Sequence, residues 1–98
     1  IFASQNISIG RNCLIAPFCY IVDANHQIVS GELIRKQALS VSEIKIGNDV
    51  WLGANVTVLP GVTIGDGAVV GAGSVVNKNI PKNAVAAGVP VKILKYRS

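Results

Sequence analysis

The side chain best suited to chemistry in this sequence is that of His26, the only histidine. An imidazole takes up and releases a proton near neutral pH, so it can serve as a general base. Three carboxylates in the same polar segment, Asp23, Glu32 and Glu43, could orient the ring and stabilise the imidazolium. The spacing alone also fits an ordinary surface histidine, so it nominates His26 without defining a reaction.

The sequence lacks the motifs of several other chemistries. It has no Gly-x-Ser-x-Gly elbow for a nucleophilic serine and no Walker loop for a nucleotide phosphate. One histidine and two cysteines, Cys13 and Cys19, are too few ligands for a zinc site, so we expect no metal. We expect both cysteines to be small buried free thiols, which favours a reducing, cytoplasmic setting.

The second half of the chain ends in a segment with positive charge only. After Asp66, the last acidic residue, come five of the nine basic residues: Lys78, Lys82, Lys92, Lys95 and Arg97. Such a segment suits a phosphate-bearing partner, with a solvated tail as the alternative. The basic residues are sparse and no aromatic stacking platform is interleaved with them, so we expect a small phosphorylated cofactor rather than nucleic acid.

A six-residue repeat must position these groups. An aliphatic residue followed by a small one recurs from Ile9 to Ile21 and again from Ile46 to Val76. Residues six apart do not share one face of an α-helix, and this period is typical of a parallel β-helix, in which three units form one triangular coil. The fifth position of each unit is small and is predicted to point inward. Glycine at the second position is expected to supply the unusual backbone of each corner.

The repeat is interrupted once, and the interruption contains His26. Polar insertions in repeat proteins leave the stack as loops, often on the binding side. We therefore expect one all-β domain of about three coils. Its predicted parts are a first coil (1–23), an extruded active-site loop (24–45), further coils (46–79) and a short C-terminal tail (80–98). Apolar residues in the loop (Leu33, Ile34 and Leu39) suggest that it docks on a neighbouring subunit.

Composition limits the chain to one domain of 98 residues, half of them apolar and 5% aromatic. We find no apolar run long enough to span a membrane and no signal segment at the start. The sequence begins at Ile1 without a methionine, inside the repeat pattern. We therefore expect a C-terminal fragment of a longer protein, completed by an upstream cap or by partner subunits.

Two stretches resemble the hexapeptide-repeat acyltransferases. One begins Ile46-Gly-Asn-Asp-Val-Trp-Leu-Gly-Ala, and the other is the ending Asn-Ala-Val-Ala-Ala-Gly-Val-Pro-Val-Lys. The ending resembles that of the sugar O-acetyltransferases of the galactoside, maltose, and capsule or lipopolysaccharide types, and Asp-Ala-Asn-His26 resembles a loop motif of the last type. The resemblance implies a left-handed β-helix and a homotrimer with active sites between subunits. It also implies transfer of an acetyl group from acetyl-CoA to a saccharide hydroxyl, with His26 as general base.

The same resemblance implies roles for other residues. Trp51 would line the acceptor or thioester end of the site, with Asn25 and Glu32 beside the substrate and Asp23 or Glu32 holding the imidazole. The positions implied for acetyl-CoA, from its pantetheine arm to its phosphates, are Ala54, Ala72, Asn77, Lys78, Lys92 and Lys95. The first four are expected on one ridge, with the Gly88-Val-Pro90 turn near the cofactor.

The sequence also departs from the galactoside type. Ala3 stands where those relatives carry an asparagine, which argues against a galactoside-type pocket. Two alternatives remain open: an N-acetyltransferase of an amino sugar, and a non-catalytic β-helix scaffold. A γ-class carbonic anhydrase shares the architecture but would need several histidine ligands for zinc.

Overall fold

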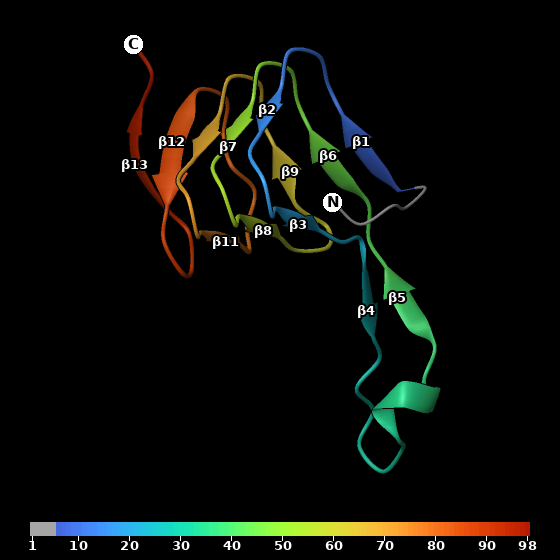
Figure 1. Ribbon diagram of the computed structural model, residues 1–98. Coiled ribbons are helices and arrows are strands. Elements are labelled where there is room, and N and C mark those ends of the chain that lie inside the picture. The colour runs from blue at the N-terminus through green and yellow to red at the C-terminus, as the bar shows by residue number, and fades with distance from the viewer. Residues whose placement is uncertain (1–5) are drawn as a thin grey trace.

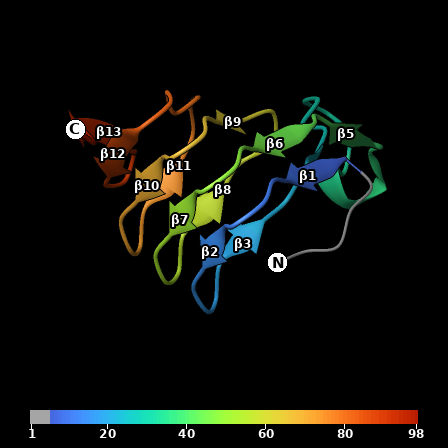
Figure 2. The same ribbon diagram turned by 90° about the horizontal axis from the view of Figure 1, so that it is seen from above.

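The computed structural model describes residues 6–98 and shows an elongated stack of parallel β-coils (Figure 1). Face A contains β1 (Ile7–Ile9), β6 (Ile44–Ile46) and β9 (Thr63–Ile64). Face B contains β2 (Leu14–Ile15), β7 (Trp51–Leu52), β10 (Val69–Val70) and β12 (Ala84–Ala87). Face C contains β3 (Tyr20–Ile21), β8 (Thr57–Val58) and β11 (Val75–Val76). In Figure 2 each coil forms one step of the stack. The predicted all-β solenoid of about three coils is confirmed. Ala3, the position at which the sequence departs from the galactoside type, lies outside the described residues.

The aliphatic residue of each repeat fills the narrow core. Leu52, Val58, Ile64, Val70 and Val76 end their strands and are all buried. Full burial of such a side chain contributes about 1.5–3 kcal/mol. The fifth positions also point inward. Those that are buried are Cys19, Val50, Val56, Val62, Ala68 and Ser74, whereas Cys13 is half-buried. Two inward side chains per unit explain why the period is six and why the second one is small.

The corners have left-handed backbone at the fourth position of each unit and not at the second. The residues there are Asn12, Phe18, Asp49, Asn55, Gly61, Gly67, Gly73 and Asn83, with φ between 56° and 83°. Asn, Asp and Gly tolerate this conformation. The expectation that the second position carries the unusual backbone is wrong. Glycine is needed there for close approach, because a Cβ on Gly53 would lie 2.7 Å from the amide nitrogen of Ala72 in the next coil.

The two cysteines are free thiols that bond to the coil stacked on them. The Sγ of Cys13 donates to the carbonyl of Gly47 at 3.2 Å, and that of Cys19 donates to the carbonyl of Gly53 at 3.1 Å. Both side chains therefore serve as small inward groups at corners.

The extruded segment is a β-hairpin, not an irregular loop. Strand β4 (Ala24–His26) pairs antiparallel with β5 (Leu39–Val41), and a 3₁₀ turn, η1 (Ile34–Lys36), lies near the tip. Figure 1 shows the hairpin projecting away from the coils. The predicted loop end at residue 45 is two residues late. Ile44 already pairs with Ile7 as part of β6. It is fully buried because β6 points the side chains of both Ile44 and Ile46 into the core.

The segment from residue 80 continues the solenoid before it turns back. Ile80 is buried and bridges Ile64 in parallel, and β12 extends face B. The chain then reverses into β13 (Lys92–Tyr96), which pairs antiparallel with β12 and covers its edge. Arg97 fastens this end, donating from Nη1 to the Gly67 carbonyl at 2.9 Å. The predicted tail is therefore mostly ordered β-structure.

Candidate functional site

His26 lies on an apolar face of the hairpin. Residues directly opposite each other in an antiparallel pair share a face, and His26 is opposite Leu39 while Ala24 is opposite Val41. Leu39 and Val41 are 57% and 53% exposed, so within residues 6–98 much of that face is left uncovered. Asn25 is opposite Ser40 on the other face. The structure therefore separates Asn25 from His26, although they are neighbours in sequence.

The two carboxylates expected to hold the imidazole lie in different environments. Asp23 is buried at the base of the hairpin, where its backbone carbonyl accepts a hydrogen bond from the Ser42 amide at 2.8 Å. Glu32 is exposed at the tip. Asp23 is an odd number of residues from His26, so the pleat of an extended strand turns their side chains to opposite sides. The backbone geometry selects neither carboxylate as the partner of His26.

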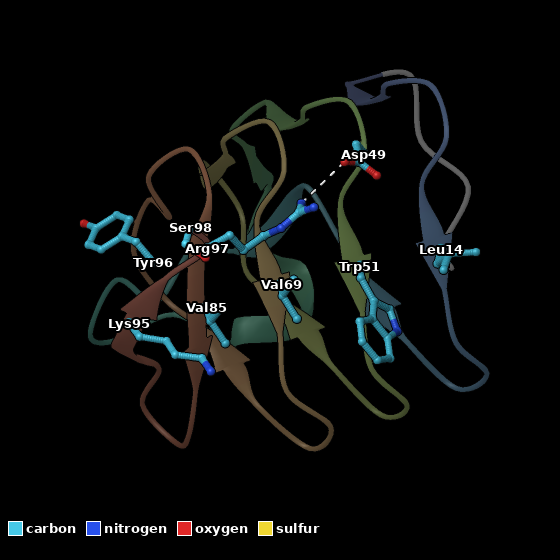
Figure 3. A pocket seen from close by; sticks show the side chains of 9 residues that line it. All are labelled: Leu14, Asp49, Trp51, Val69, Val85, Lys95, Tyr96, Arg97 and Ser98. Carbon is cyan, nitrogen blue, oxygen red and sulfur yellow. Dashed lines mark hydrogen bonds and ion pairs between the residues drawn. The ribbon is translucent and has the colours of Figure 1, made fainter.

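Trp51 lies in a row of outward side chains on face B. Register places Leu14 beside Trp51, Trp51 beside Val69, and Val69 beside Val85, with Lys95 of β13 beyond. These side chains form the floor of an open hollow of about 610 Å³, whose rim includes Asp49, Tyr96, Arg97 and Ser98 (Figure 3). The hollow combines an apolar floor, one indole and one lysine, which suits a ligand with both apolar and anionic parts.

The sequence reasoning found Trp51 and Lys95 but missed the rest of this floor. Leu14, Val69 and Val85 each directly precede an inward residue, the same place in the unit that Trp51 occupies. An apolar residue at this outward position in successive coils is a sequence signal for an apolar floor. Reading that signal requires knowledge of which repeat units stack on one another.

The residues expected along acetyl-CoA occupy two edges of the triangular prism. Ala54 and Ala72 stack at the corner between faces B and C, where the Gly73 amide donates to the Ala54 carbonyl at 2.8 Å. Gly88 lies at the same corner, its amide donating to Oγ of Ser74 at 3.0 Å. Asn77 and Lys78 follow β11 and therefore lie at the corner between faces C and A. The expected single ridge is not observed.

The hairpin leaves the coils at the same edge as Asn77 and Lys78. It follows β3 of face C and precedes β6 of face A, so it leaves at the edge opposite face B. His26 and the Trp51 hollow are consequently on different sides of one chain. Lys92 and Lys95 are both exposed on β13 at the face B side. The candidate residues therefore form two separate groups, one with the histidine and one with the tryptophan and the lysines.

Within residues 6–98, no group of three or more His, Cys, Asp or Glu side chains is placed to hold a metal ion. Over the same residues, no helix is long and apolar enough to cross a membrane.

The repeat segment matches a known family model. Residues 43–78 match the model described as bacterial transferase hexapeptide (six repeats). The chain is also 47% identical over 89 residues to the galactoside O-acetyltransferase of Escherichia coli K12, an alignment covering 91% of this chain and 43% of that protein. Across four curated relatives, the chain spans between 31% and 57% of their length, about half.

Two solved structures share the fold over nearly the whole chain. A maltose O-acetyltransferase from Clostridium difficile 630 gives a TM-score of 0.81 at 35% identity, covering 96% of this chain and 60% of that one. A galactoside acetyltransferase in complex with coenzyme A gives 0.75 at 38% identity, covering 94% and 56%. The predicted resemblance is thereby confirmed: the chain carries the bacterial transferase hexapeptide repeat, folds as a left-handed parallel β-helix and resembles the hexapeptide-repeat acyltransferases.

Proposed function

We propose that this chain is the β-helical part of an acetyltransferase that moves an acetyl group from acetyl-CoA to a hydroxyl of a sugar or saccharide. The observation that carries the proposal is the placement of the only histidine on an exposed apolar hairpin face, in a chain that resembles galactoside and maltose O-acetyltransferases. An imidazole covered by a partner on that face would be shielded from water while staying open to a hydroxyl.

The site is proposed to form between copies of the chain in a homotrimer. In one chain His26 and Trp51 lie on different sides, which supports a site in which a second copy brings its face B hollow to the hairpin. The exposed apolar residues on the His26 face and on the floor of the hollow, such as Leu39 and Leu14, offer complementary surfaces for this contact. Each interface would then hold one histidine and one hollow.

In this site His26 accepts the proton of the acceptor hydroxyl as its oxygen attacks the thioester carbonyl. The new C–O bond forms, the C–S bond breaks, and the leaving thiolate takes the proton from the imidazolium. Asp23 or Glu32 orients the ring, and Trp51 of the neighbouring copy faces the acceptor. Asn25 lies on the opposite face of the hairpin from His26 and is not part of this site. Such general-base assistance is typically worth about 10²–10⁴-fold in rate.

The implied contacts with acetyl-CoA fit the residues present. The side chains of Ala54 and Ala72, which stack at the corner between faces B and C, are small and would leave room beside them for the pantetheine arm. Lys92 and Lys95 on β13 would hold the phosphates, and Asn77 and Lys78 would contribute from the other edge. We propose a cytoplasmic setting, a reducing compartment where the free thiols of Cys13 and Cys19 stay reduced.

The test is a panel of acceptors incubated with acetyl-CoA and the protein. The panel contains galactosides, maltose, other saccharides and amino sugars, and CoA release is read by chromatography because Cys13 and Cys19 could react with thiol reagents. Acetylation of a hydroxyl that is lost in Asp23→Asn or Glu32→Gln would also identify the carboxylate that orients His26. Acetylation only of amino groups would replace this proposal with an amino-sugar N-acetyltransferase. Absence of CoA binding by calorimetry in a stable trimer would indicate a scaffold.

A further inference from the structure

Gln37 is the only buried residue of the hairpin between Ala24 and Val41. The hydrogen bonds of its side chain all join backbone atoms. Its Oε1 accepts from the Val29 amide at 2.8 Å, and its Nε2 donates to the Val29 carbonyl at 3.1 Å. The same Nε2 donates to the Glu32 carbonyl at 3.1 Å. With only 9% of the residue exposed, these bonds are largely shielded from water.

These bonds continue the hairpin ladder beyond its last backbone rung. After the paired residues His26 and Leu39, the Gln27 amide donates to the Ala38 carbonyl at 3.2 Å. The next place in the ladder is taken by the Gln37 amide group, which bonds both the amide and the carbonyl of Val29 as an opposing strand would. His26 is thus one residue from Gln27, which makes the last backbone bond of the ladder, and three residues from Val29, which the Gln37 side chain binds.

The hairpin has few other interactions to hold its tip. Ile28, Val29, Leu33 and Ile34 are all exposed, so apolar burial within the chain contributes little there. Isolated two-stranded hairpins are marginally stable in water. Loss of the three Gln37 bonds would leave partly buried backbone groups without protein partners, and fraying would extend from the tip towards His26.

We propose that Gln37 is a positioning residue: its side-chain amide clasps the hairpin tip and thereby fixes the backbone that presents His26. The catalytic consequence rests on the proposed acetyl transfer, whereas the structural part does not. A displaced general base slows the chemical step but leaves the distant binding of acetyl-CoA intact.

The experiment compares three variants of the whole chain by hydrogen exchange and by steady-state kinetics. Gln37→Ala removes the clasp. Gln37→Met keeps the length and packing of the side chain but makes none of its three hydrogen bonds. Gln27→Ala is the matched control, since it removes an exposed glutamine from the same hairpin. The Gly53 amide, which donates to the Val70 carbonyl at 2.9 Å, serves as the reference for an intact coil stack.

We expect both Gln37 variants to raise the exchange rate of the Val29 amide about tenfold or more, because a buried bond is lost, while the Gly53 amide is unchanged. We also expect kcat to fall about tenfold with the KM for acetyl-CoA within about twofold. Unchanged Val29 exchange in Gln37→Met, or faster exchange with an unaltered kcat, would overturn the proposal. If the wild-type chain transfers no acetyl group, the proposed function fails, and Val29 exchange still decides whether Gln37 is the clasp.

Discussion

The coil stack and the hairpin of this chain are held together by different interactions. In most of the coils, two inward side chains per repeat are buried, and the strands bond to those of the neighbouring coil. In the hairpin, apolar side chains such as Leu39 and Val41 are exposed and a glutamine supplies the tertiary bonds at the tip. The coils are therefore held mainly by buried apolar side chains and by backbone bonds between strands, whereas the hairpin tip depends on the Gln37 side chain.

The largest expected effect separates chemistry from stability. We expect His26→Ala to lower the acetylation rate about 10²–10⁴-fold, because a general base is lost. The side chain is exposed, so the midpoint of urea unfolding, followed by the fluorescence of Trp51, should not move. A rate within a few-fold of wild type would mean that the hairpin is not the catalytic half.

A second comparison makes the same change, leucine to alanine, once in the coil core and once in the hairpin. Leu52→Ala removes a fully buried side chain from the coil core and should lower the free energy of unfolding by about 2–5 kcal/mol. Leu33→Ala removes an exposed side chain near the hairpin tip and should change it by less than about 0.5 kcal/mol. Urea denaturation of the two variants measures both values. Equal losses would show that the hairpin contributes to the same cooperative unit as the coils.

Glycines provide a third comparison. Gly53→Ala places a Cβ 2.7 Å from the backbone nitrogen of Ala72, so the coils must move apart at a cost of about 1–3 kcal/mol. Gly31→Ala meets no atom within 4 Å, and its cost arises only from a φ of 90°. Because that strain is confined to the hairpin tip, we expect it to raise amide exchange there without shifting the urea midpoint. A larger shift for Gly31→Ala than for Gly53→Ala would contradict this difference.

The smallest expected effect concerns the C-terminal end of the coils. Arg97→Ala removes the bond to the Gly67 carbonyl and an exposed ion pair with Asp49 at 3.4 Å, together about 0.5–1 kcal/mol. Asp49→Asn removes only the charge, and asparagine tolerates the left-handed φ of 56° at that position. Its expected loss is a few tenths of a kcal/mol, measured by the same urea titration. Equal losses for the two variants would show that the ion pair, rather than the bond to Gly67, dominates.

Much of the fold could be predicted because the repeat is local. A six-residue period with an aliphatic and a small residue identifies the inward positions directly, and the interruption locates the hairpin and His26. The corner backbone was assigned to the wrong residue because glycine is used for two reasons, left-handed φ at Gly67 and close approach at Gly53. The sequence pattern does not distinguish the two.

By itself, the sequence determined the scaffold, the inward residues and the single histidine, since each depends on residues close together in the chain. Only the tertiary structure decided which residues share an edge. The partner of Leu14 is Trp51, 37 residues on, whereas the partner of Trp51 is Val69, only 18 residues on. Ala54 and Asn77 lie on different edges because they follow strands of different faces, and the hairpin leaves at the edge opposite face B, away from Trp51. The Gln37 clasp likewise has no sequence signal, because its three bonds are to backbone atoms whose position depends on the folded hairpin.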